Sequence, residues 1–425
     1  MTESPETTRA ARVIARCREL ARITDVSGET TRLFLSPATR DAHTLLAWWL
    51  RQAGLESRTD DAGNLRALRP AYPARPAAKP CAPTLVLFSH IDTVPNAGAF
   101  DGPLGVILAL AALEELHQTP LPFNIELIAF SEEEGVRFGF PFLSSLAVTG
   151  KLAPELLTRT DANGVTVAQA IMEFGLNPAN IATTCPLAPQ TFAAIEVHIE
   201  QGPVLESRAA HLDPNAASIA VVESIIGQSR LHLTFTGQSN HAGTTPMALR
   251  RDALAAAAQW VTEVERYAAS YTQLVATVGR LEVAPGAINV VPGSVRATLD
   301  VRHPKDESRH AAVAHLLTKA ESAAALRGVT VSAMLDSEQK AVPMNRELTV
   351  KLHQAAERAG FDAQSIFSGA GHDAMILAPA VPTAMLFLRS PGGLSHHPDE
   401  SVREEDVEAA LATLLNLLLH LHPHA

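Results

Sequence analysis

The sequence predicts an α/β fold with a mostly parallel central sheet, into which a smaller α+β sandwich domain is inserted. Three short apolar runs at 84–88, 124–130 and 192–197 predict the sheet. They are rich in β-branched or large apolar residues and bounded by polar ones, as buried parallel strands are. A histidine or an acidic residue follows each run, directly or after one serine. Because the ligand crevice of an open parallel sheet lies outside the carboxyl ends of its strands, we expect these side chains to converge at one edge.

The chain before the first strand reads as two helices and a loop. Helical periodicity at 10–20 and 41–53 leads to a turn at 60–64. Five prolines between 70 and 83 then predict a surface loop that ends at the first strand. After that strand, the apolar spacing at 104–113 indicates another helix.

The middle of the chain predicts the inserted domain. Beyond Leu212-Asp213-Pro214 come alternating strands at 230–235 and 294–301, with an alanine-rich helical stretch at 251–267 between them. We therefore expect a catalytic domain built from 1–213 and 339–425, and a lid or dimerisation domain at 214–338. A helix at 402–421 closes the chain.

Composition favours a cytoplasmic two-domain protein. The 425 residues are enough for two domains with sizeable cores, and the net charge of -11 disfavours nucleic acid or an anionic membrane surface as a partner. The three scattered cysteines Cys17, Cys81 and Cys185 fit a reducing compartment without a disulfide framework. The polar first nine residues contain no signal core, and no apolar run is long enough to span a bilayer.

The residues at the strand ends suit a metal site. His90, His198 and the acidic pair Glu133 and Glu134 combine imidazole with carboxylate, which favours zinc, manganese, cobalt or nickel. No cysteine lies in these segments, which argues against a closed structural zinc site. Asp101 could bridge a pair of metals roughly 3.5 Å apart, leaving one glutamate as a base.

Each of these residues also has a structural interpretation. Asp101 could be the N-cap of the helix at 104–113, and the glutamates at 132–134 could form a solvated acidic turn. Any one of the 17 histidines could be an ordinary surface or core residue. Their combination at several strand ends favours the metal site.

The motifs resemble the amidase/hydantoinase/carbamoylase family of dinuclear metallohydrolases, which includes allantoate amidohydrolases and N-carbamoyl-L-amino acid hydrolases. The resemblance runs in order over nearly the whole chain. It rests on SHIDTVP at 89–95, FDG at 100–102, EEGVRF at 133–138, HIEQGPVLE at 198–206, HAGTTPM at 241–247, GHDA at 371–374 and GLSH at 393–396.

The resemblance implies a metallopeptidase-like catalytic domain that binds two divalent metal ions, zinc or manganese, with cobalt or nickel as alternatives. The metal ligands it implies are His90, Asp101 as the bridge, Glu134, His198 and His396, and it makes Glu133 the general base. His397 directly follows His396 and stays an alternative for the last ligand.

It also implies a homodimer in which residues of the inserted domain complete the active site of the neighbouring subunit. His241 would stabilise the oxyanion, and Asn289 and Arg302 would hold the substrate carboxylate. Without the resemblance, Arg302 could simply pair with Asp300 or with an exposed glutamate.

Three further positions, Gln201, Gly371 and His372, match substrate contacts of the family. His372 could equally form a hydrogen-bonded pair with Asp373 behind the ligands.

The implied reaction is hydrolysis of the ureido (carbamoyl) C–N bond of a substrate that carries a carboxylate. The segment 132–139 and the residues at 142, 143 and 145 favour an allantoate amidohydrolase that releases ammonia and carbon dioxide. The alternative is an N-carbamoyl-L-amino acid hydrolase. An aminoacylase or dipeptidase, and a binding protein for ureido acids without catalysis, stay open as well.

Overall fold

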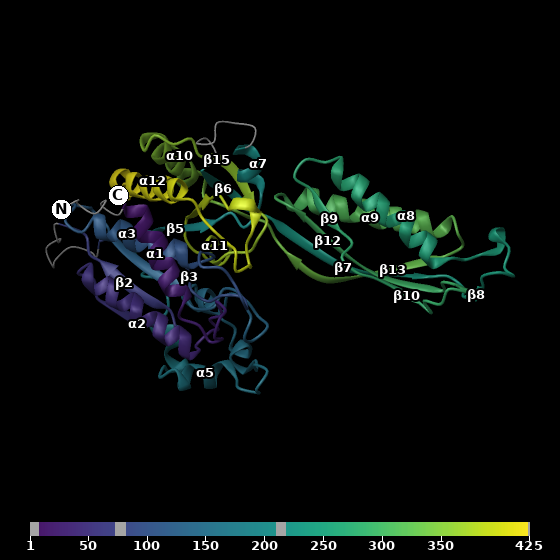
Figure 1. Cartoon of the computed structure of the whole chain (residues 1–425), viewed down its shortest axis with the longest axis horizontal. Helices are drawn as coiled ribbons and strands as arrows, with labels where there is room; N and C mark the ends of the chain where they lie inside the picture. Colours follow the sequence, from purple (N-terminus) through teal and green to yellow (C-terminus); the bar gives the residue numbers. More distant parts are fainter. Residues whose placement is uncertain (1–7, 73–81, 210–217, 424–425) are drawn as a thin grey trace. The chain divides into compact units, whose positions relative to one another are not determined.

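The computed structural model describes residues 8–72, 82–209 and 218–423, which fall into two compact units (Figure 1). The first unit consists of Met1–Glu223 and Met344–Ala425, and the second of Ser224–Pro343. Cys81, part of the proline-rich loop and the predicted domain passage at 212–214 lie outside the described residues.

The first unit combines a large sheet with helices. Its sheet is nine-stranded, in the order β1-β2-β4-β3-β5-β16-β6-β14, with β15 paired to β6. The strands are β1 (Ser57–Thr59), β2 (Leu65–Arg69), β3 (Thr84–His90), β4 (Asn124–Phe130), β5 (Thr191–Ile199), β6 (Ile219–Ile225), β14 (Val342–Pro343), β15 (Gln364–Ser368) and β16 (Thr383–Leu388). The α-helices are α1 (Arg9–Ala21), α2 (Pro37–Gln52), α3 (Pro103–Glu115), α4 (Leu143–Val148), α5 (Val167–Glu173), α6 (Ile181–Thr184), α7 (Val204–Ala209), α10 (Arg346–Arg358), α11 (Asp373–Leu377) and α12 (Glu404–His420). Short 3-10 helices are η1 (Pro154–Thr158), η2 (Pro178–Asn180) and η5 (Pro391–Gly393).

The four central strands β4, β3, β5 and β16 are parallel, and antiparallel strands flank them. The predicted mostly parallel sheet is confirmed for this core. All residues of β3 and β16 are buried, which explains why these strands read as unbroken apolar runs.

Within each central strand, alternate residues face opposite sides of the sheet. Leu85 and Leu87 of β3 belong to the main hydrophobic core, together with residues of α1, α3, α10 and α12. Phe88 points to the other face, and its partner across the ladder is Glu196 of β5. His90 and His198, each two residues further along its strand, therefore share that second face, away from the main core.

Side-chain caps mark the first residues of the two N-terminal helices. Thr8 accepts a hydrogen bond from the amide of Ala11 at the start of α1. Helix α2 starts at Pro37, earlier than the predicted 41, because Ser36 caps the amide of Thr39 and Pro37 occupies the first turn. The apolar spacing marked the buried face of α2 but not its polar first turn.

The second unit has two layers. Its sheet has the order β10-β12-β7-β13, with β9 paired to β12, and α8 and α9 pack on one face (Figure 1). The strands are β7 (Gly227–Thr236), β8 (Asn240–His241), β9 (Val275–Thr277), β10 (Leu281–Ala284), β11 (Val290–Val291), β12 (Ser294–His303) and β13 (Thr330–Gln339); the helices are α8 (Ala253–Ala269), α9 (Asp306–Ala325) and the 3-10 helix η4 (Met247–Leu249). Buried residues alternate along β7 and β12 and pack around Trp260 of α8. Strands β8 and β11 form a separate two-stranded pair.

None of the helices in the described ranges combines the length and apolar character needed to cross a membrane.

Candidate metal centre and active site

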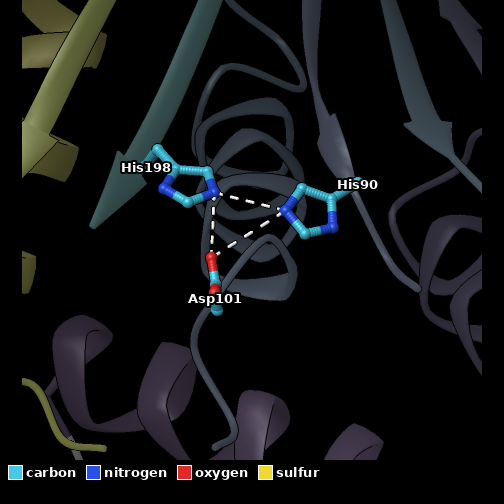
Figure 2. A group of neighbouring side chains, drawn as sticks. All are labelled: His90, Asp101 and His198. Atoms are coloured by element: carbon cyan, nitrogen blue, oxygen red, sulfur yellow. Dashed lines mark hydrogen bonds and ion pairs between the residues drawn. The ribbon is translucent and has the colours of Figure 1, made fainter. Parts of the chain in front are cut away.

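Two strand ends and the start of α3 bring three side chains together (Figure 2). His90 is the last residue of β3, His198 is the next-to-last residue of β5, and Asp101 lies two residues before α3. The Nε2 atoms of the two histidines are 3.3 Å apart. Asp101 Oδ1 lies 3.2 Å from His198 Nε2 and 3.9 Å from His90 Nε2. All three side chains are buried.

The hydrogen bonds of the two histidines occupy their Nδ1 atoms and leave the two Nε2 atoms facing one another. His90 Nδ1 lies 3.1 Å from the carbonyl oxygen of Asp92, and His198 Nδ1 lies 2.9 Å from that of Ile199. Because a carbonyl only accepts, each Nδ1 carries a proton, and the Nε2 of a neutral ring presents a lone pair. Among the described residues, Asp101 Oδ1 has no hydrogen-bond partner although it is buried. Three such donor atoms are well suited to a divalent metal ion.

The carboxylates around His90 also favour positive charge at this place. Burial lowers the pKa of His90, but Asp92, Glu133 and Asp101 outweigh it and raise that pKa well above its usual value. Burial raises the pKa of Asp101, but the opposite effect of the neighbouring histidines is larger. The net pKa therefore lies below its usual value, and the carboxylate stays ionised. A divalent cation would meet the same demand for positive charge.

Asp101 also belongs to a second group of potential ligands. His396 Nε2 lies 3.1 Å from Asp101 Oδ2 and 3.8 Å from Glu134 Oε1. Asp101 thus offers one oxygen to each group, as a bridging carboxylate does. His397 points elsewhere, because its Nδ1 accepts the amide of Asp399 at 3.1 Å. The geometry therefore favours His396 over His397 as the fifth ligand.

Glu133 lies beside both groups. Potential ligand atoms of Glu133, His90 and Glu134 lie within 4.8 Å of one another. The amides of Glu133 and Glu134 both donate to the Asp92 carboxylate, which holds this turn in place. Burial raises the pKa of Glu133 well above its usual value, against the lowering effect of His90. A carboxylate with a raised pKa is a stronger base, which suits proton transfer near neutral pH.

Two of the structural alternatives are excluded. Gly102, not Asp101, is the residue that precedes the first residue of α3, and no side chain among the described residues caps this helix. Glu132 and Glu133 are 1% and 7% exposed, so the acidic run is not a solvated turn. These carboxylates lie near His90 because the end of β4 pairs with the end of β3. The local sequence does not reveal this pairing.

The first unit also contains the three remaining predicted positions of the catalytic domain. Gln201 Nε2 donates to Asp101 Oδ2 at 2.9 Å and lies 3.3 Å from His396 Nε2. The His372 ring lies edge-on to His198, with centroids 4.6 Å apart, and Gly371 precedes it. The described partner of His372 Nε2 is Ser368 Oγ at 2.9 Å rather than Asp373. Burial lowers the pKa of His372 well below its usual value, so this ring is neutral.

The second unit contains the positions expected to act on a neighbouring subunit. His241 lies in β8 and pairs with Val290 of β11, next to the exposed Asn289. His241 Nδ1 accepts the amides of Gly243 and Thr244, so the proton of the neutral ring lies on Nε2. The ring therefore presents an N–H donor to its surroundings.

Arg302 lies in β12 and forms the ion pair that the sequence left open. Its Nε and Nη2 lie 2.9 and 3.1 Å from the two carboxylate oxygens of Asp300. Asp300 Oδ2 also accepts from Arg230 Nε at 3.1 Å. The pair is partly exposed, so solvent screens it.

Two carboxylates beside the site were missed from the sequence. Asp92 holds the Glu133–Glu134 turn, and Glu400 accepts the amides of Phe100 and Asp101. Each follows a candidate ligand histidine at short spacing, His90 by two residues and His396 by four. An acidic residue shortly after a ligand histidine was the available signal.

Comparison with known proteins shows to which family the chain belongs. The model of Peptidase family M20/M25/M40 matches residues 86–420. An N-carbamoyl-L-amino acid amidohydrolase of Geobacillus stearothermophilus is 36% identical over 93% of this chain and 94% of its own length. An allantoate amidohydrolase of Escherichia coli (strain K12) is also 36% identical, over 93% of this chain and 94% of its own length. The crystal structure of a hydantoinase/carbamoylase family amidase from Burkholderia multivorans has a TM-score of 0.86 at 34% identity, covering 96% of this chain and 97% of that one. The chain thus belongs to the M20/M25/M40 family, among its amidohydrolases of the hydantoinase/carbamoylase type.

Proposed function

We propose that this enzyme hydrolyses the ureido C–N bond of a carboxylate-bearing substrate, with allantoate as the first candidate. The observation that carries the proposal is the pair of ligand groups that share Asp101, with the buried carboxyl of Glu133 beside both. The relatives with an allantoate amidohydrolase name and those with an N-carbamoyl-L-amino acid amidohydrolase name match equally well. N-carbamoyl-L-amino acids are therefore the second candidate class. The motif at 132–139 is our reason for placing allantoate first.

Two divalent ions, zinc or manganese, would fit the two groups; cobalt and nickel suit the same donors. The first group is His90, His198 and Asp101, and the second is Asp101, Glu134 and His396. When bound, the ions would make a water molecule more acidic and polarise the ureido carbonyl.

Glu133 would act as the proton carrier. Its carboxylate accepts the proton of the attacking water and returns it to the nitrogen that leaves. Its raised pKa suits both transfers, because the protonated form persists until the C–N bond breaks. Asp92 would keep the Glu133 side chain in position, because its carboxylate accepts hydrogen bonds from the amides of Glu133 and Glu134. The carbamate released then breaks down to ammonia and carbon dioxide.

A homodimer would supply the rest of the site. The Nε2–H of His241 from the partner subunit would donate to the developing oxyanion, an interaction worth on the order of 3 kcal/mol. Asn289 and Arg302 would hold the substrate carboxylate. Since Asp300 already receives two N–H groups of Arg302, the substrate has to compete with Asp300 for them. Gln201, Gly371 and His372 of the catalytic unit would line the substrate site.

The test is ammonia release by protein reconstituted with manganese or zinc, offered allantoate and a panel of N-carbamoyl-L-amino acids in parallel. We expect turnover of allantoate first. Preference for a carbamoyl amino acid would exchange the two candidates. Release from neither, with cleavage of N-acyl amino acids or dipeptides, would contradict the proposal.

Glu133→Gln separates catalysis from binding. The substitution keeps the shape of the side chain but removes its basicity, so we expect kcat to fall by about 100-fold or more while substrate binding, measured by calorimetry, is retained. An unchanged kcat would show that another group carries the proton.

A further inference from the structure

Glu400 connects Asp101 with Ser395, which lies 294 residues further along the chain. Its side chain is buried, and its Oε1 accepts the amides of Phe100 and Asp101 at 2.8 and 2.9 Å. Its Oε2 accepts the hydroxyl of Ser395 at 3.2 Å. One carboxylate therefore holds the main chain at the bridging Asp101 and the residue directly before His396.

The Ser395 hydroxyl completes the connection. Its oxygen lies 3.0 Å from Asp101 Oδ2, the same oxygen that faces His396, as well as within reach of Glu400. The serine proton is thus shared between two carboxylates. The main chain and the side chain of Asp101 are both tied to the 395–400 loop.

The backbone before Asp101 approaches the Glu400 side chain closely at Gly98. A Cβ on Gly98 would lie 2.3 Å from Glu400 Cβ, so the segment before Asp101 packs directly on this side chain. The amide of Glu400 itself donates to the carbonyl of His397 at 3.0 Å, which closes the loop after His396.

The two ligand groups differ in how much they depend on this connection. His90 and His198 are held by the hydrogen-bonded strands β3 and β5. The residue after Asp101 also packs on that side, because a Cβ on Gly102 would lie 2.5 Å from the His90 ring. His396 lies on a loop, has a backbone φ of 55° and is half exposed. Its place relative to Asp101 is therefore set by the 395–400 loop.

We propose that Glu400 is a positioning residue for the second metal ion, the one assigned to Asp101, Glu134 and His396. It acts through the amide of Asp101 and through Ser395, which keep Asp101 Oδ2 and His396 facing one another. The ion assigned to His90, Asp101 and His198 depends on it far less. This inference rests on the two-metal site of the proposed function.

The test is a calorimetric titration of the metal-stripped full chain with Mn²⁺ or Zn²⁺. We expect two ions in the wild type. In Glu400→Ala, one ion should keep its affinity while the other weakens about 10- to 100-fold, as is typical when the support of a ligand is removed. Glu400→Gln should stay close to the wild type, because its amide oxygen can still accept both main-chain amides and its NH₂ group can donate to Ser395.

Asp60→Ala is the matched control. Asp60 is also a buried carboxylate whose Oδ1 accepts two main-chain amides, those of Ala62 and Asn64, and none of its described contacts reaches a candidate ligand. This variant should lower the unfolding temperature and leave both ions bound as before. Should Glu400→Ala fail to fold, Ser395→Ala compared with Glu400→Gln carries the test, and Ser395→Ala should weaken the same single ion.

If Glu400→Ala and Ser395→Ala both bind the two ions with wild-type affinity, this inference is overturned and the proposed function is not. A parallel loss of both ions would also overturn the inference, because Glu400 would then support the fold rather than one site. A wild type that binds fewer than two ions would instead refute the two-metal site of the proposed function, and the inference with it.

Discussion

At the scale of single residues, the site is organised around shared atoms. Asp101 faces His198 with one oxygen and His396 with the other, while Gln201 and Ser395 donate to the second oxygen. A buried carboxylate with this many neighbours keeps a single orientation. That orientation is what lets one side chain serve two ligand groups.

His43 gives the protein a specific acid sensitivity. Its side chain is buried, with Nε2 3.3 Å from Ser131 Oγ, and burial, aided by Arg32 and Arg40, lowers its pKa to about 3. In the unfolded chain the pKa is about 6.5. As the pH falls from about 6.5 toward 3, the unfolded state takes up a proton that the folded state does not. The free energy of unfolding should therefore fall by up to about 1.4 kcal/mol per pH unit through this group.

His43→Gln checks this contribution by urea denaturation at pH 7.5 and pH 5. The variant should be less stable at pH 7.5, because it loses packing against Phe174, yet lose less stability between the two pH values than the wild type does. An equal loss in both proteins would show that His43 is not the group responsible.

At the scale of elements, helix α3 and strand β5 place Asp101 against His198. They approach closely at Gly105, where a Cβ would lie 2.0 Å from the carbonyl oxygen of Val197. Backbone cannot move aside as a flexible side chain can. Gly105 therefore sets the distance between the start of α3 and the ligand-bearing end of β5.

Gly105→Ala should force α3 away from the sheet and lower the free energy of unfolding by about 1–3 kcal/mol, the usual cost of overpacking. Chemical denaturation measures the loss. Gly369→Ala is the control: no atom of the described part of the chain lies within 4 Å of its added Cβ, so a change within about 0.5 kcal/mol is expected. Similar values for the two variants would mean that α3 shifts without cost.

At the scale of the whole molecule, the candidate residues are divided between two units. The potential metal ligands and Glu133 belong to the first, whereas His241, Asn289 and Arg302 belong to the second. In the proposed dimer, each active site contains residues of two chains. Complementation between two inactive variants tests this directly.

Glu133→Gln and His241→Ala should each be inactive alone. Unfolded together and refolded as a 1:1 mixture, they should recover about a quarter of wild-type activity, because half of the dimers are mixed and each mixed dimer has one intact site. Ammonia release measures the recovery, with each variant refolded alone as the control. No recovery, although mixed dimers form, would place His241 in the active site of its own chain.

The sequence by itself determined the buried strands, the order of the motifs and the chemical type of the site. Apolar runs that end in histidine or acidic residues are local features. In a parallel sheet they predict that these polar side chains lie at the edge where the strands end. The positions of His90, Glu133 and His198 at strand ends were therefore predictable. His396 came only from the resemblance, since it lies on a loop with no periodic pattern around it.

Only the tertiary structure decided which atoms face one another. The position of Asp101 between two ligand groups, its approach to His396 and the hydrogen bond from its amide to Glu400 all depend on contacts between residues far apart in the sequence. Such contacts follow from the packing of the sheet, helix and loops, which no local pattern encodes. The same packing explains why the acidic run at 132–134 is buried rather than solvated, because the strand that precedes it ends inside the molecule.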